Sequence, residues 1–495
     1  MKALVNAKVF TPSALQGKTY PADCLLFSDK IEAIGEYSAL KGQFPSGTKV
    51  YDCAGGYVLP GFVDAHTHLA SWGSSLRYVD LEEASSLEEA VRKIKEGAKA
   101  KQPGEWLIAV RWDESRWKEG RYLTKEDLDE VTPAHPVLAV RMCGHIGVLN
   151  TVAFKTLSLN PEKFPQGLVK EQSLDEIRRR VAPSAEVRKK DIHTAGWMAL
   201  SLGVTCIGEI AHLSDFELYY DLLREGEFPI RVYAIPLWEE WKESGKKKIP
   251  EIPQWLWMGG VKLFADGSLG ARTARLKESY ADAPGVGEWV LHPQELNSAI
   301  GEIFDSNLQP VIHCIGDEAI EQVLQILEKI HREKDLKRFR PRLEHFEMAK
   351  GEHIEQLKNL GGIASMQPNF VGRWGIMGGL YEKRLGPERA RRMNPFLEVV
   401  LRECPLAFGS DMMPFSPLFG IRSTVFAPFL KQKLTEAQAL LAYTSGSAFA
   451  CFAEHWLGSL EPGKKADITV WDKWLSEFPR LQFCFVNGVL KYPRE

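Results

Sequence analysis

The chain lacks the features that mark secreted, membrane-spanning and nucleic-acid-binding proteins. Its eight cysteines are scattered without a Cys-x-x-Cys spacing, which in so long a chain argues for reduced thiols rather than a disulfide framework. No stretch reaches the roughly 18 unbroken apolar residues of a membrane span. The segment Met1–Phe10 is too polar for the apolar core of a signal peptide. Basic and acidic residues, 62 and 65, nearly balance at a net charge of −3, so the basic footprint of a nucleic-acid binder is missing. We expect a soluble, cytoplasmic protein with no membrane or nucleic-acid partner.

Short apolar runs alternate with segments of helical period from Tyr57 onward. The runs are apolar along nearly their whole length, as expected for strands that are covered on both faces. Eight strand-then-helix units predict an α/β protein built on a (β/α)₈ TIM barrel. The expected strands are Tyr57–Asp64, Gly203–Ile210, Ile230–Leu237, Gly259–Asp266, Gln309–Ile315, Pro341–Phe346, Gly362–Pro368 and Pro405–Asp411. The expected helices are Ser214–Glu225, His292–Asn307, Glu318–Glu333, Gly351–Leu360, Pro387–Arg402 and Thr435–Phe449.

Two parts of the chain depart from this repeat. Residues from about 70 to 187 separate the first strand from the helix before the second, too many for an ordinary loop, and we expect an inserted lid or subdomain. Strand patterns also occupy both ends of the chain, where Asn487-Gly488 is a typical hairpin turn. These end strands lack partners within their own segments. We therefore expect a small β-sandwich built from residues 1–55 and 455–495 around a barrel of residues 56–454.

Two histidines directly follow the first expected strand. His66 and His68 are two positions apart, so in an extended segment both imidazoles point to the same side and could hold one metal ion. Such a pair also occurs by chance as two hydrogen-bonded loop residues. Its place at the carboxyl end of a strand favours a site, because barrel active sites lie on that face.

Lys262 is the least expected polar residue, since it lies within the apolar strand Gly259–Asp266. Charged side chains are almost never fully buried without a partner. Three explanations stay open. Lys262 could form an internal ion pair with Asp266 or Asp411, or it could be an amine of lowered pKa, as in Schiff-base enzymes. It could also be carbamylated by carbon dioxide, which would make it an anion able to bridge two cations.

Three further candidates lie at the ends of later strands. His313 and His345 end two successive strands, and Asp411 ends the eighth. A single histidine at such a place is more often structural, and an aspartate there often caps a turn or helix. Imidazole and carboxylate groups repeated at the same end of so many strands instead indicate a metal site.

The motifs around these residues resemble those of a known superfamily. They are Leu59-Pro-Gly-Phe-Val-Asp-Ala-His-Thr-His68, Val261-Lys-Leu-Phe-Ala-Asp-Gly-Ser268, Leu343-Glu-His345, Gly409-Ser-Asp411 and the closing Gly458-Ser-Leu-Glu-Pro-Gly-Lys-Lys-Ala-Asp467. The chain resembles the amidohydrolase superfamily of metal-dependent hydrolases along nearly its whole length. It is most similar to the branch called amidohydrolase family 3, which includes N-substituted formamide deformylases.

This resemblance implies a centre with one or two divalent ions, zinc being the favoured metal. His66, His68 and Asp411 would hold one ion and His313 and His345 the other, with carbamylated Lys262 as the bridge. A metal-activated hydroxide would be the nucleophile. Asp411 would accept the proton of that water and deliver it to the leaving nitrogen.

The resemblance also implies three substrate-contact candidates. Arg141 and His145 lie in an inserted stretch typical of the branch, and either could contact the substrate or only hold the insert together. Glu209, at the end of the second expected strand, could reach the site or only support a metal-bound histidine.

We expect an enzyme that hydrolyses a non-peptide carbon–nitrogen bond of a small molecule, such as an amide, N-formyl, N-acyl or cyclic amide. Two alternatives stay open. A mononuclear deaminase of a heterocyclic amine is disfavoured because that class needs no lysine at position 262. A non-catalytic regulatory protein on an amidohydrolase scaffold is disfavoured because no ligand position is lost. The β-sandwich and the outer helices leave room for a homodimer.

Overall fold

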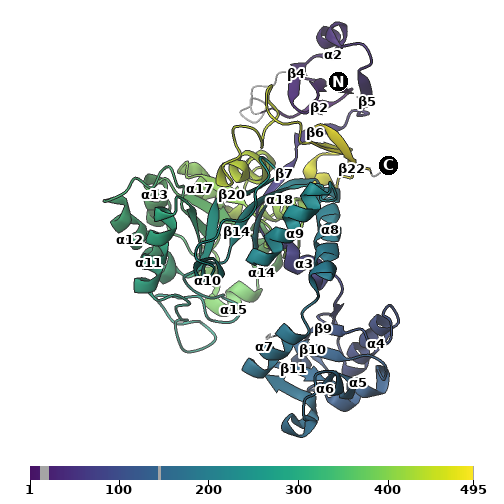
Figure 1. The fold of residues 1–495 in the computed structure, drawn as a ribbon. Coiled ribbons are helices and arrows are strands. Elements are labelled where there is room, and N and C mark those ends of the chain that lie inside the picture. The colour runs from purple at the N-terminus through teal and green to yellow at the C-terminus, as the bar shows by residue number, and fades with distance from the viewer. Residues whose placement is uncertain (12–21, 143–145, 494–495) are drawn as a thin grey trace. The chain divides into compact units, whose positions relative to one another are not determined.

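The computed structural model describes residues 1–11, 22–142 and 146–493, which form two compact units (Figure 1). One unit comprises Met1–Ala70 with Ile192–Glu495, and the other comprises Ser71–Asp191. No helix in the described part of the chain is long and apolar enough to cross a membrane.

A closed barrel of parallel strands forms the centre of the larger unit. Its eight strands, among the described residues, are β7 (Phe62–Thr67), β13 (Val204–Ala211), β14 (Arg231–Pro236), β16 (Gly260–Phe264), β17 (Gln309–Cys314), β18 (Arg342–His345), β19 (Ile363–Met366) and β20 (Leu406–Phe408). A bridge between Leu237 and Lys262 joins β14 to β16. The Asp411 N–H donates to the carbonyl of His66 at 2.9 Å, which joins the segment after β20 to β7. The predicted TIM-barrel-type α/β fold is therefore confirmed.

Helices follow the barrel strands, and their apolar positions recur at helical spacing. In α12 (Asp317–His331), Ala319, Ile320, Val323, Leu324 and Leu327 are buried, while acidic residues occupy the first turn and basic residues the last, as the helix dipole favours. The other helices of this unit are α9 (Leu213–Arg224), α10 (Trp238–Glu243), α11 (Pro293–Asp305), α13 (Gly351–Asn359), α14 (Pro368–Trp374), α15 (Leu380–Leu385), α16 (Pro387–Ala390), α17 (Phe396–Leu401), α18 (Pro417–Val425), α19 (Glu436–Leu441) and α20 (Ser447–Ala450), with a π-helical turn at Ala442–Gly446. Two more, α3 (Leu69–Ser75) and α8 (Ala185–Ser201), include the points where the chain passes between the units.

Two predicted elements are each broken in two. The expected strand Tyr57–Asp64 ends at Gly61, where a Cβ atom would lie 2.2 Å from the Thr205 hydroxyl oxygen. The residues before Gly61 instead form β6 (Tyr57–Pro60), which pairs with a strand near the C-terminus. The expected helix Pro387–Arg402 is interrupted at Asn394, which has a left-handed φ of 51° and precedes a proline.

The two chain ends form a pair of sheets with a common core. One sheet has the strand order β4-β3-β1-β5, and the other has the order β2-β6-β21-β22-β23. Leu25, Phe27, Val58, Ile468 and Phe485 are among the buried side chains between them. The expected turn at Asn487-Gly488 joins β22 to β23, with φ of 51° and 71°. The strands are β1 (Lys2–Val5), β2 (Lys8–Val9), β3 (Cys24–Phe27), β4 (Ile31–Gly35), β5 (Lys49–Asp52), β21 (Ile468–Trp471), β22 (Leu481–Val486) and β23 (Val489–Tyr492), and a short helix α2 (Tyr37–Leu40) follows β4.

The unit Ser71–Asp191 is a five-stranded sheet with helices and its own apolar cores. The sheet has the order β12-β11-β10-β9-β8, and Trp112 and Trp117 are buried between it and its helices. Its elements are β8 (Val79–Asp80), α4 (Leu87–Ala98), β9 (Leu107–Trp112), α5 (Lys125–Val131), β10 (Val137–Arg141), β11 (Ile146–Leu149), α6 (Thr151–Thr156), β12 (Leu168–Lys170) and α7 (Glu171–Arg180).

Candidate metal centre

All six residues predicted as metal ligands line one cavity at the carboxyl ends of the barrel strands. The cavity has a volume of about 360 Å³. Adjacent imidazole rings lie close together, with ring-centre distances of 5.4 Å for His66 and His68, 5.1 Å for His66 and His345, and 4.4 Å for His313 and His345. Barrel closure thus brings together side chains that are up to 345 positions apart in the sequence.

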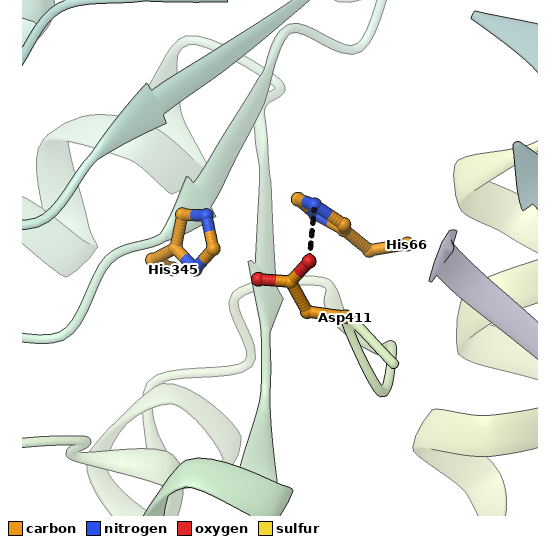
Figure 2. A group of neighbouring side chains, drawn as sticks. All are labelled: His66, His345 and Asp411. Atoms are coloured by element: carbon orange, nitrogen blue, oxygen red, sulfur yellow. Dashed lines mark ion pairs between the residues drawn. The ribbon is translucent and has the colours of Figure 1, made fainter. Parts of the chain in front are cut away.

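Asp411 lies beside several of these histidines. Figure 2 shows its carboxylate directed toward the space between His66 and His345, with Oδ1 3.7 Å from Nε2 of His66. The same oxygen is 3.2 Å from Nε2 of His68. Nitrogen or oxygen atoms from His66, His345 and Asp411 all lie within 4.8 Å of one another. Such a group of imidazole and carboxylate donors suits a divalent transition-metal ion.

Strained backbone turns two of these side chains toward the cavity. His345 has a φ of 69° and Asp411 a φ of 48°, both in the left-handed region that non-glycine residues rarely adopt. In a regular strand, His345 would point away from the side on which its neighbour Glu344 lies. Here Glu344 contacts His66, and the ring of His345 also faces His66. Strain of this kind costs about 1–3 kcal/mol per residue and tends to cluster at functional sites.

Hydrogen bonds fix which nitrogen of His66 and of His313 is open to a metal ion. Glu344 contacts Nδ1 of His66, and the carbonyl of Ile210 lies 3.0 Å from Nδ1 of His68. The carbonyl of Gly267 lies 3.0 Å from Nε2 of His313. Because these oxygens can only accept, each contacted nitrogen carries the proton. The other nitrogen, Nε2 in His66 and Nδ1 in His313, keeps its lone pair for a metal ion. In His68 the second nitrogen, Nε2, lies 3.2 Å from the Asp411 carboxylate and donates to it.

Burial keeps the central histidines neutral, which is the form that binds metal. It lowers the pKa of His66 to about 4 and that of His313 to about 3, and it lowers the pKa of His345 well below the usual range. His68 differs: burial acts to lower its pKa, but the hydrogen bond and charge of Asp411 outweigh burial and raise it. Burial also acts to raise the pKa of Asp411, yet His66 and His68 lower it, so its carboxylate is charged at neutral pH.

Lys262 is buried at this site without a hydrogen-bonding partner. Its side chain is 1% exposed, and within the described residues its Nζ accepts or donates no hydrogen bond. The ion pair with Asp266 or Asp411 that the sequence left open is not formed. Asp266 instead accepts backbone N–H groups of Arg275, Ile315 and Gly316. Burial lowers the pKa of Lys262 to about 8, so a substantial fraction of the amine is unprotonated near neutral pH.

Glu344 holds His66 in place, a role that sequence reasoning missed. It is fully buried between His66 and Arg342, whose Nε donates to Oε1 at 2.8 Å. Burial alone would raise the pKa of Glu344, but Arg342 and then His66 hold it well below its usual range. A signal was present in the sequence: two charged residues two positions apart in an apolar strand share one side and can pair there.

Two of the three substrate-contact candidates, Glu209 and Arg141, lie within the described residues. Glu209 is fully buried beneath the loop that carries the histidines. Its carboxylate accepts from the Thr67 hydroxyl and from the backbone N–H groups of Leu69 and Ala70, at 2.6–2.9 Å, and it does not line the cavity. Arg141, in the unit Ser71–Asp191, donates to both carboxylate oxygens of Glu114 at 2.8 Å. His145 lies outside the described residues.

The remainder of the cavity wall is mostly apolar and comes largely from β16, α14 and α15. Apolar lining of this kind is typical of small-molecule sites. The apolar and aromatic residues are Phe264, Leu269, Ile315, Phe370, Trp374, Leu380, Tyr381 and Met413, and the polar lining residues other than the six predicted ligands include Ser268 and Glu347.

Residues 49–482 match the amidohydrolase family. The chain belongs to this family. Protein LONG AFTER FAR-RED 3 of Arabidopsis thaliana is 27% identical over 539 residues, covering 99% of this chain and 91% of that protein. An N-substituted formamide deformylase of Arthrobacter pascens is 23% identical over 539 residues, covering 99% and 98%.

A solved structure gives the same result for the fold. An uncharacterized metal-dependent hydrolase from Pyrococcus furiosus superposes with a TM-score of 0.81 at 30% identity, over 96% of this amidohydrolase and 100% of that chain. The protein is therefore an enzyme, a metal-dependent hydrolase of carbon–nitrogen bonds. The donor set at the cavity fits a divalent ion, since neutral imidazoles, a carboxylate and the unpartnered Lys262 amine converge there.

Proposed function

We propose that this amidohydrolase cleaves a non-peptide carbon–nitrogen bond of a small molecule, an amide, N-formyl, N-acyl or cyclic amide, at a centre of two zinc ions. The observation that carries the proposal is the Nζ of Lys262, which lies among four histidines and Asp411 and has no hydrogen-bond partner within the described residues. An orphaned buried amine is costly, and conversion to a carbamate would give it two anionic oxygens to share between cations. The deformylase relative makes formamides the first substrates to test.

Each proposed ligand then has a distinct part. His66, His68 and Asp411 would hold one ion, His313 and His345 the other, and the Lys262 carbamate would touch both. Metal ions held there would make water nucleophilic at neutral pH and polarise the scissile carbonyl. Asp411 would accept the proton of the attacking water and return it to the leaving nitrogen, and its lowered pKa keeps it in the charged form that can accept a proton at neutral pH.

Residues at a distance from the ions have supporting parts in this proposal. Glu344 and Glu209 would orient the histidine loop, so we now assign Glu209 to positioning rather than to substrate contact. Arg141 would hold the insert together through Glu114. We further propose a barrel at residues 56–454, a β-sandwich from 1–55 and 455–495, and an inserted lid at about 70–187.

Location and assembly are part of the same proposal. The seven cysteines within the described residues are free and buried, which suits a reducing compartment such as the cytoplasm. Sedimentation velocity would test whether the chain forms a homodimer.

The metal content per chain, measured by inductively coupled plasma mass spectrometry on untagged protein purified without chelator, tests the centre directly. About two ions per chain would support it. One ion would favour the alternative, a mononuclear deaminase of a heterocyclic amine. No ion, even after zinc and bicarbonate are supplied, would favour a non-catalytic regulatory protein.

Two variants test the assigned roles. Lys262→Ala should lose metal and nearly all formamide hydrolysis, and the wild-type protein should gain activity when bicarbonate is added to bicarbonate-depleted apoprotein with zinc. Asp411→Asn should keep its fold and lose turnover. Wild-type rates in Lys262→Ala would exclude the carbamate bridge, and full rates in Asp411→Asn would assign proton transfer to another group.

A further inference from the structure

The wall of the active-site cavity contains a polar patch that the proposed metal centre does not use. Glu347 and Tyr381 line the cavity together with the six proposed ligands and the apolar side chains. They come from different segments. Glu347 follows β18, and Tyr381 is the second residue of α15. Ser268, the third polar lining residue, has a local partner, because its hydroxyl accepts the N–H of Ala271 at 3.3 Å.

Glu347 and Tyr381 are buried, and within the described residues one polar atom of each lacks a hydrogen bond of normal geometry. Their exposed fractions are 2% and 3%. They lie near enough to each other and to Asn394 for weak hydrogen-bond interactions, which act to lower the pKa of Glu347 against the larger effect of burial. Even so, Glu347 Oε2, the Tyr381 hydroxyl and both amide atoms of Asn394 make no hydrogen bond of normal geometry to any described residue. Each buried polar atom without a hydrogen bond lowers the stability of the fold by about 1–3 kcal/mol. A cluster of such atoms beside a substrate cavity therefore indicates that a bound ligand supplies the missing hydrogen bonds.

The backbone holds this patch in position. The N–H of Asn394 donates to the carbonyl of Glu347 at 2.7 Å, and the Tyr381 ring packs edge-on against Trp374 with ring centres 6.5 Å apart. The backbone of Glu347 and the ring of Tyr381 are therefore held in position at the wall before any ligand arrives, an arrangement that favours selective binding.

We propose that Glu347 and Tyr381 form a subsite that accepts a hydrogen bond from an N–H group on the substrate, at the end of an apolar body that the rest of the cavity encloses. This inference rests on the proposed function and narrows its substrate class: the amide carries a second nitrogen, an amino or similar N–H donor. A carboxyl group offers an acceptor oxygen in either protonation state, and a tyrosine hydroxyl can accept as well.

A matched pair of formamides tests the subsite. N-[(4-aminophenyl)methyl]formamide carries an N–H donor where N-[(4-methylphenyl)methyl]formamide carries a methyl group of nearly the same size. For zinc-loaded wild-type protein we expect the amino compound to bind at least about 10-fold more tightly, by isothermal titration calorimetry, because its donor pairs with groups otherwise left unsatisfied. The kcat/KM values of the two compounds should differ by the same factor as their affinities.

Variants assign this preference to the two residues. We call the affinity for the amino compound divided by the affinity for the methyl compound the amino-to-methyl ratio. Glu347→Leu and Tyr381→Phe should each reduce this ratio, and Glu347→Leu should bring it close to one. Glu347→Gln keeps an acceptor oxygen and should keep most of the ratio even if it changes stability. Tyr280→Phe is the matched control: it removes a buried tyrosine hydroxyl that donates to the carbonyl of Ala274 and does not line the cavity. Its ratio should equal that of the wild type. Metal content measured for every variant excludes loss of the centre as the cause.

Different results would contradict the proposed hydrolysis and the proposed subsite. Binding with the expected preference but no hydrolysis would support the subsite and contradict the proposed reaction. Hydrolysis of both compounds at equal kcat/KM would support the reaction and overturn the subsite. The subsite would also be overturned if the preference survived in Glu347→Leu, or if neither compound bound.

Discussion

Replacing Glu344 by glutamine separates what this buried carboxylate does for the fold from what it does for the metal centre. Three donors converge on it: Nε of Arg342 at 2.8 Å, the Ser365 hydroxyl at 2.9 Å and Nδ1 of His66. A glutamine offers one acceptor oxygen and presents an N–H₂ group in place of the other carboxylate oxygen. Either the arginine or the histidine therefore loses its partner.

The stability cost follows from the burial of the pair. Arg342 and Glu344 are both fully buried, and removing one partner of such a pair costs about 3–5 kcal/mol because it leaves the other charge uncompensated. The cost for metal affinity is separate. Losing the group that orients a metal-binding histidine typically weakens affinity by about 10–100-fold.

Urea unfolding of chelator-treated protein measures the first effect, and competition with a chromophoric chelator for zinc measures the second. The double variant Arg342→Met with Glu344→Met is the control. It removes both charges, so we expect it to recover much of the stability while keeping the weakened zinc affinity. Wild-type zinc affinity in Glu344→Gln would refute the role assigned to this carboxylate.

The pH dependence of the unfolding free energy gives an independent check that Glu344 stabilises the fold in its charged form. In the folded chain, Arg342 and His66 hold the pKa of Glu344 below its usual range, despite burial, whereas the unfolded value is about 4.3. The charged pair therefore stabilises the fold above about pH 4.3 and loses that contribution as pH falls further. The difference in unfolding free energy between the wild type and Glu344→Gln should be largest near neutral pH and should narrow from about pH 5 to pH 3.

Three further predictions concern regions away from this pair. Asp467→Asn leaves the buried guanidinium of Arg231 without the carboxylate that it contacts at 2.8 and 2.9 Å, so urea unfolding should show a loss of about 3 kcal/mol with unchanged metal content. Gly409→Ala would place a Cβ 2.5 Å from His66, so zinc affinity should fall. Gly301→Ala in α11, where the Cβ meets nothing within 4 Å, should leave that affinity unchanged. Burial raises the pKa of buried thiols such as Cys451 to about 12, so at pH 8 a disulfide reagent should label at most one of the eight cysteines before unfolding and all eight after it. Rapid labelling of two or more in the folded chain would contradict the described burial.

Much of the barrel, and the gathering of the candidate metal ligands at one end of it, could be predicted because these features are local in sequence. Each strand is a short apolar run, and His66, His313 and Asp411 each follow or end such a run. Since all parallel barrel strands end on the same face of the barrel, side chains at the ends of these strands are expected to lie close together. The hairpin at Asn487-Gly488 was predictable for a similar reason, because its turn chemistry is encoded in two residues.

Other features depend on contacts between distant residues. The break at Gly61 depends on the close approach of Thr205, which no local pattern records. The inward turn of His345 depends on a left-handed φ that strand alternation does not predict. The polar patch of Glu347 and Tyr381 exists because the segments around β18 and α15 meet at the cavity.

The sequence by itself determined the fold class, the family and the set of candidate metal-binding side chains, because periodicity and motif spacing depend on neighbouring residues. Only the tertiary structure decided which nitrogen of His66 and His313 is open, that Lys262 has no hydrogen-bond partner among the described residues, and that Glu209 bonds the backbone after β7 instead of lining the cavity. These properties depend on which atoms meet across the barrel. Those contacts exist only once the strands have closed around a common centre.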